Sequence, residues 1–116
     1  GRHSIDAYGE GGFKFAGMSH RGSLLALPSG LFAWDATTPA DINEASLARV
    51  FAEAADTIEH LLVGTGLDFA PLAPALAQRL RARKIVAEPM ATGAAARTYN
   101  ILMGEGRRVA AALIAV

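Results

Sequence analysis

The chain has 116 residues, of which 52% are hydrophobic and 19% are charged, proportions that exclude an intrinsically disordered chain and suit one domain spanning residues 1–116. Eleven Lys and Arg balance eleven Asp and Glu, so the net charge of zero removes the usual sign of a nucleic-acid-binding protein. Because the chain lacks cysteine and any apolar run of about 20 residues, we expect a soluble, cytoplasmic protein without disulfides, cysteine nucleophiles or a transmembrane segment.

The first third of the chain is predicted to form strands. Residues 12–16 alternate phenylalanine with smaller or polar residues, and residues 23–27 form a short apolar run that ends at Pro28-Ser29-Gly30. Residues 31–34 would complete a hairpin with this run, and a further strand is expected near Ile5. The pattern therefore predicts a β-meander.

The hydrophobic period then changes from strand to helix. Apolar residues from Leu47 to Ile58 recur at helical spacing, which predicts an amphipathic helix with Asn43 as its N-cap. Residues 58–63 are apolar with β-branched residues at both ends, and they stop at a Gly-Thr-Gly sequence, as a buried strand would.

Helices and strands are predicted to alternate through the rest of the chain. A second helix begins near Pro71 and Pro74. Residues 85–88 form a short strand that Pro89 ends, and Thr92 caps a third helix over 93–103 that Gly104 closes. Residues 109–116 are apolar on both faces, like an interior strand. This order predicts a sheet with parallel strand pairs covered by helices.

The glycine pair around Thr65 is the first candidate binding site. The backbone amides of Gly64, Thr65 and Gly66 follow a predicted strand and could cradle a phosphate, with Glu88 near the place of a ribose-binding acid. The dinucleotide motif GxGxxG would need a third glycine where this chain has Phe69. We therefore favour a structural tight turn over a nucleotide site.

The start of the third helix is the second candidate. The amide of Gly93, the hydroxyl of Thr92 and, about one turn later, the charge of Arg97 would suit a small anion. Ligands gather beyond the carboxyl ends of parallel strands, so the loops at 64–66 and 92–93 should face one crevice. A ligand would lie in that crevice.

A structural interpretation of the same helix start competes with the anion site. Thr92 would be an N-cap, the alanines at 94–96 would allow close packing on the sheet, and Arg97 would pair with Glu88 or Glu105. We favour this interpretation. The set of residues retained for ligand binding is Gly64, Thr65, Gly66, Thr92, Gly93 and Arg97.

No residues combine into a recognisable catalytic or metal site. His3, His20 and His60 are scattered and lack the spacing of zinc-binding helices, and no serine lies in a GxSxG sequence. The basic stretch 79–84 is interpreted as a solvated helix end. We predict no catalytic residue, no metal and no cofactor.

Several short motifs fall in the order seen in a known family. They are GGFKF at 11–15, HRGSLL at 20–25, GTG at 64–66, TGAAARTYN at 92–100 and GEGRRVAA at 104–111. These motifs extend over nearly the whole chain. In their order and spacing the sequence resembles the MTH nine-three-eight-like domain family, also called domain of unknown function four-nine-eight.

The resemblance implies a three-layer α/β fold with a central mixed sheet, flanking helices and an additional N-terminal β-layer. It implies no established reaction. The family includes a mitochondrial respiratory complex I assembly factor and an adipogenesis-associated cytosolic protein, so protein partners are implied, among them respiratory complex assembly proteins. We therefore predict a non-catalytic interaction or assembly domain. The alternative is a small-anion-binding protein or enzyme with its pocket between the 64–66 loop and the Thr92 helix start.

Overall fold

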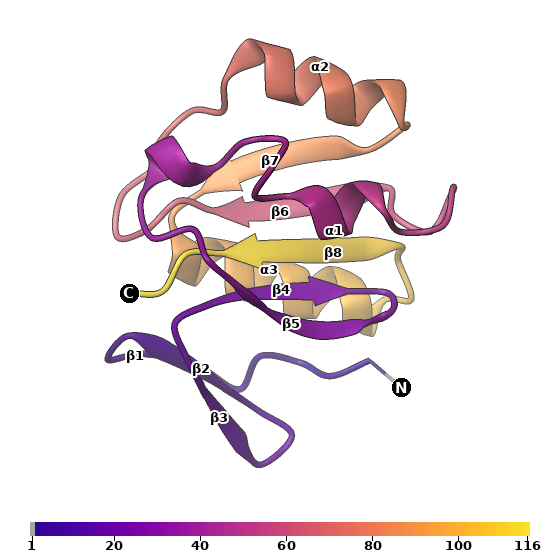
Figure 1. The fold of residues 1–116 in the computed structure, drawn as a ribbon. Coiled ribbons are helices and arrows are strands. Elements are labelled where there is room, and N and C mark those ends of the chain that lie inside the picture. The colour runs from indigo at the N-terminus through magenta and orange to yellow at the C-terminus, as the bar shows by residue number, and fades with distance from the viewer. Residues whose placement is uncertain (1) are drawn as a thin grey trace.

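A five-stranded mixed sheet lies at the centre of residues 2–116, the part of the chain that the computed structural model describes (Figure 1). Its strands are β4 (Ser23–Leu27), β5 (Gly30–Trp34), β6 (His60–Gly64), β7 (Val86–Met90) and β8 (Val109–Leu113), in the order β5-β4-β8-β6-β7. β6 runs parallel to β7 and β8, whereas β4 runs antiparallel to β5 and β8. The predicted hairpin of β4 and β5 and the predicted α/β class are both confirmed.

A second, three-stranded sheet forms the additional N-terminal β-layer. It consists of β1 (Ala7–Gly9), β2 (Gly12–Phe15) and β3 (Met18–Arg21), each antiparallel to the next. Phe13 and Phe15 are buried, and they fix this small sheet against the central one. β3 was not predicted, because its sequence Met-Ser-His-Arg shows no apolar alternation.

Helices cover both faces of the central sheet. They are α1 (Ala48–Phe51), α2 (Pro74–Ala82) and α3 (Thr92–Gly104), with a 3₁₀ turn at Pro39–Asp41. α3 and the small sheet share one face through a core containing Phe13 and Tyr99, while α1 and α2 pack on the other through a core containing Val50 and Leu80. None of the helices in residues 2–116 is long and apolar enough to span a membrane.

The predicted helix from Leu47 to Ile58 is wrong in its length, since α1 contains only four residues. Leu47, Val50 and Ile58 are buried as expected, whereas Ala54 and Ala55, which share the apolar spacing, are exposed. The guanidinium of Arg83 donates a hydrogen bond of 2.7 Å to the Phe51 carbonyl, which satisfies an acceptor at the end of α1. Asp56 then adopts a positive φ of 64° and turns the chain into β6. Arg83 is therefore part of the packing rather than only a solvated helix end.

Two predictions near β7 are also corrected. Pro89 lies inside β7, paired with Val63, because β7 is the edge strand of the sheet and an edge position tolerates a missing amide donor. Thr92 is not the N-cap of α3, which is Ala91; Thr92 is the first helical residue, and its hydroxyl makes hydrogen bonds elsewhere. Helix α3 otherwise matches the predicted range.

Candidate functional site

The structure brings together the two loops that the sequence placed in one crevice. β6 and β7 are parallel and in register, so they end side by side at Gly64 and Met90. The Thr92 amide donates to the Gly66 carbonyl at 2.8 Å, and the Gly66 amide donates to Thr92 Oγ1 at 3.0 Å. Residues 64–66 and the start of α3 are therefore joined by two hydrogen bonds between Gly66 and Thr92.

Both threonine hydroxyls in these loops have partners within the chain. Thr92 is fully buried, and its hydroxyl donates to the Ile114 carbonyl at 2.8 Å. The hydroxyl of Thr65 donates to the Asp68 carbonyl at 2.7 Å and accepts from the Ala70 amide at 3.0 Å. These bonds join β6, α3 and the C-terminal segment, so the polar groups expected to receive a ligand hold the backbone in place.

Arg97 neighbours a tyrosine rather than a carboxylate. Its Nη1 donates to the Tyr8 hydroxyl at 3.1 Å, and among residues 2–116 it makes no ion pair with Glu88 or Glu105. Tyr8 also lies so close to Gly93 that a Cβ there would overlap its hydroxyl. The guanidinium is therefore exposed and available, whereas the expected structural ion pair is absent from the described residues.

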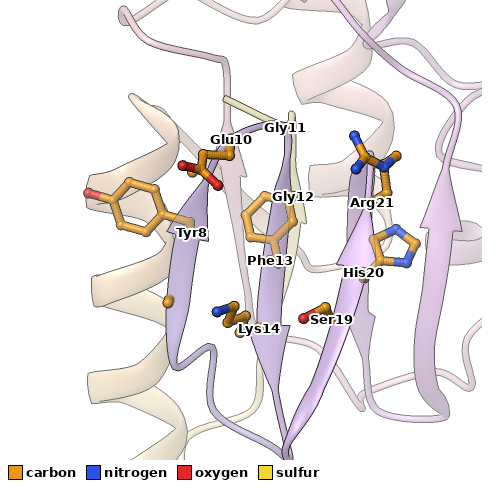
Figure 2. Close-up of a pocket in the computed structure, with 11 residues that line it drawn as sticks. Tyr8, Glu10, Gly11, Gly12, Phe13, Lys14, Ser19, His20 and Arg21 are labelled. Atoms are coloured by element: carbon orange, nitrogen blue, oxygen red, sulfur yellow. The ribbon is translucent and has the colours of Figure 1, made fainter.

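A concavity on the small sheet begins at Tyr8 and was not anticipated from the sequence. It encloses about 620 Å³ over strands β1 to β3 (Figure 2). Polar side chains on its lining are Tyr8, Glu10, Lys14, Ser19, His20 and Arg21. Since β3 was missed, the pairing that brings residues 19–21 beside β2 could not be inferred.

Two large apolar side chains are exposed in the loop after β6. Leu67 is 83% exposed and Phe69 is 62% exposed, beside a shallow groove of about 390 Å³ that the C-terminal segment also lines. We call Leu67 and Phe69 the apolar loop pair. The loop is anchored through Thr65, so both side chains are presented from a backbone with fixed hydrogen bonds.

A charged cluster lies at the opposite end of β6. Glu59 accepts hydrogen bonds from Arg107 at 2.8 Å and from Arg108 at 3.0 Å, and these bonds, Arg107 first, lower the pKa of its carboxyl below the ordinary value. His60 lies 2.9 Å from Glu59, and its Nδ1 is 3.7 Å from Glu88. Within residues 2–116 no three His, Asp or Glu side chains are arranged to hold a metal ion.

Comparison with known proteins gives a match over nearly the entire chain. Residues 5–114 match the family described as protein of unknown function (DUF498/DUF598). An uncharacterized protein of Rhodobacter capsulatus is 41% identical over 110 residues, which cover 95% of this chain and 82% of that protein.

A named relative and a solved structure extend this comparison. The mouse protein NADH dehydrogenase [ubiquinone] 1 alpha subcomplex assembly factor 3 is 36% identical over 95% of this chain, which spans only 59% of the mouse protein. A solution structure of a Bordetella pertussis Mth938-like domain has a TM-score of 0.83 at 34% identity, covering 97% of this chain and 85% of the other. The resemblance seen in the sequence is thereby confirmed.

Proposed function

The chain belongs to the DUF498/DUF598 family of proteins of unknown function, and we propose that it is a non-catalytic interaction domain that acts in the assembly of a respiratory complex. The mouse relative, an assembly factor for NADH dehydrogenase, supports an assembly role. The protein partners would be other assembly proteins or subunits of that complex. This chain spans only 59% of the mouse protein, so the partners of the whole mouse protein are a proposal for this chain.

The exposure of the apolar loop pair is the observation that carries this proposal. Burying one such side chain in an interface contributes about 1.5 to 3 kcal/mol, and contiguous exposed apolar patches mark protein-binding surfaces. The hydrogen bonds of Thr65 limit the conformational entropy that the loop would lose on binding. A protein partner that covers both side chains is therefore the interaction with the best structural support.

Replacing the apolar loop pair by serine is expected to reduce capture of the partner at least about tenfold, because most of the apolar contact would be lost. The measurement is affinity purification from the native cell with quantitative mass spectrometry. The double variant Leu67→Ser, Phe69→Ser is compared with Ile101→Ser, which removes a side chain of similar exposure, 61%, from α3. Unchanged recovery of respiratory assembly proteins with the double variant, or equal loss with Ile101→Ser, would contradict the proposal.

The alternative function, binding of a small anion at the start of α3, is supported by the exposed Arg97 beside the Tyr8 hydroxyl. Arg97→Met is expected to leave the melting temperature within about 2 °C of the parent, because the side chain has one exposed hydrogen bond. Under this alternative the variant would lose a metabolite found by a thermal-shift screen of the parent. A large drop in melting temperature, with no change in binding of any metabolite, would make Arg97 a structural residue.

A further inference from the structure

The outward face of the small sheet has cationic side chains around three glycines, Gly9, Gly11 and Gly12, which form the floor of the concavity. Phe13 and Phe15 point into the core. Because successive residues of a strand face opposite sides, Lys14, between them, points outward, and Gly12, before Phe13, lies on the same outward face. Lys14 pairs with Ser19, and Gly12 pairs with Arg21, which puts the side chains of Lys14, Ser19 and Arg21 on the same outward face. Figure 2 shows Lys14 near Ser19, with Arg21 toward the Gly12 end of the strands.

The glycine floor is fixed by the backbone. A Cβ on Gly12 would overlap the carbonyl oxygen of His20, so this position excludes any side chain. Gly11 has a φ of 78°; its amide donates to the Val116 carbonyl at 2.8 Å, and its own carbonyl accepts from the Gly22 amide at 2.7 Å. The concavity therefore has a floor that is tied to the C-terminus and to the start of β4.

The two cations at this site have no carboxylate partner within the described residues. Lys14 and Arg21 are exposed, and neither belongs to an ion pair of residues 2–116. They occupy diagonal positions on adjacent strands, where neighbouring residues are about 7 to 8 Å apart. Two cations on neighbouring strands can contact the two charged ends of a short anion. The exposed Ser19, directly opposite Lys14 and two residues before Arg21, offers a hydroxyl donor beside them.

We propose that the concave face of the β1–β3 sheet binds a small anion with two charged ends, a diphosphate or a short dicarboxylate, through Lys14, Ser19 and Arg21. The site is separate from the apolar loop pair and independent of the assembly role, and it adjoins Arg97 through Tyr8, which lines the concavity. Glu10 also lines the concavity and opposes anion binding by Coulomb repulsion. The ligand therefore meets two positive charges and one negative charge.

The test is a titration of the ¹⁵N-labelled protein with inorganic pyrophosphate and, separately, with succinate, followed by amide chemical shifts. We expect saturable shifts at the amides of Gly9, Gly11 and Gly12, which lie in the floor and carry no side chain. Lys14→Met and Arg21→Met should each weaken binding about tenfold to hundredfold, because each removes one charged hydrogen bond. Glu10→Gln should strengthen binding about twofold to tenfold by removing the repulsion.

Arg81→Met is the matched control for lost positive charge. Arg81 is exposed on α2, far along the chain from the small sheet, and this variant should leave the pyrophosphate affinity within about twofold of the parent. The proposal is overturned if neither probe gives saturable shifts at these glycines up to about 10 mM, or if chloride gives the same shifts. It is also overturned if the Arg81 variant loses as much affinity as the Lys14 variant. Shifts at Gly66 and Gly93 that depend on Arg97 would instead place the anion at the start of α3.

Discussion

Gly64→Ala is expected to lower the free energy of unfolding by about 3 kcal/mol, because the added methyl group has no space between β6 and α3. Its Cβ would lie 2.9 Å from both the Cα and the Oγ1 of Thr92, and 3.1 Å from a methyl carbon of Leu113. The first of these atoms belongs to the backbone, so relief requires α3 to move away from the sheet. Thermal unfolding should show a decrease in melting temperature of about 10 °C.

The control for Gly64→Ala is the same substitution at the other end of α3. Gly104 has no atom within 4 Å of an added Cβ, and it lies in the last turn of the helix. Gly104→Ala should therefore be neutral or stabilise the protein by up to about 1 kcal/mol, because alanine restricts the unfolded chain. Equal stability of the Gly64 variant and the parent would show that the helix start adapts easily, and would remove the close approach as a determinant of this fold.

Thr92→Val is expected to lower the free energy of unfolding by about 2 to 3 kcal/mol, although valine has nearly the same shape as threonine. The substitution leaves the Gly66 amide without its acceptor and the Ile114 carbonyl without its donor, at a side chain that is fully buried. Chemical denaturation should show a lower midpoint with an unchanged slope, as expected when stability falls without a change in the surface exposed on unfolding.

Two further variants separate the hydroxyl from the shape of Thr92. Thr92→Ser keeps both hydrogen bonds and loses one methyl group, so it should cost only about 1 kcal/mol. Thr98→Val, also in α3, removes a hydroxyl that donates a long hydrogen bond of 3.7 Å to the sulfur of Met90, and should cost less than about 0.5 kcal/mol. If Thr98→Val destabilises as much as Thr92→Val, the two hydrogen bonds of the Thr92 hydroxyl, to Gly66 and to Ile114, have no special energetic role.

The order of most elements could be predicted because local patterns and tertiary packing agree there. The Pro28-Ser29 link correctly predicted the hairpin of β4 and β5. The run that is apolar on both faces at residues 109–116 correctly predicted the interior strand β8. The helical spacing after Leu47 forms a helix only over α1, and it marks burial only in part. The irregular chain after α1, held by Arg83, buries Ile58 but leaves Ala54 and Ala55 exposed, and periodicity alone does not show where a helix stops.

The proposed binding surfaces were less predictable than the fold. Thr65 and Thr92 were recognised by their place at strand and helix ends, yet their hydrogen bonds to residues 68–70 and 114 depend on the return of the C-terminal chain. Lys14, Ser19 and Arg21 were not grouped, because their proximity requires the register of a strand whose sequence gives no signal. The exposure of Leu67 and Phe69 likewise follows from the direction in which the loop leaves β6.

The sequence by itself therefore determined the family, the α/β class and many of the inward-facing residues, since these depend on composition, local periodicity and the order of short motifs. Only the tertiary structure decided which polar groups remain available to a ligand or partner. Availability depends on contacts between residues distant in the chain: Gly66 is bonded to Thr92, whereas Lys14 and Arg21 face solvent without a carboxylate partner in residues 2–116. The hydroxyls of Thr65 and Thr92 are for this physical reason engaged within the described chain, and ligand binding at these two loops stays a prediction.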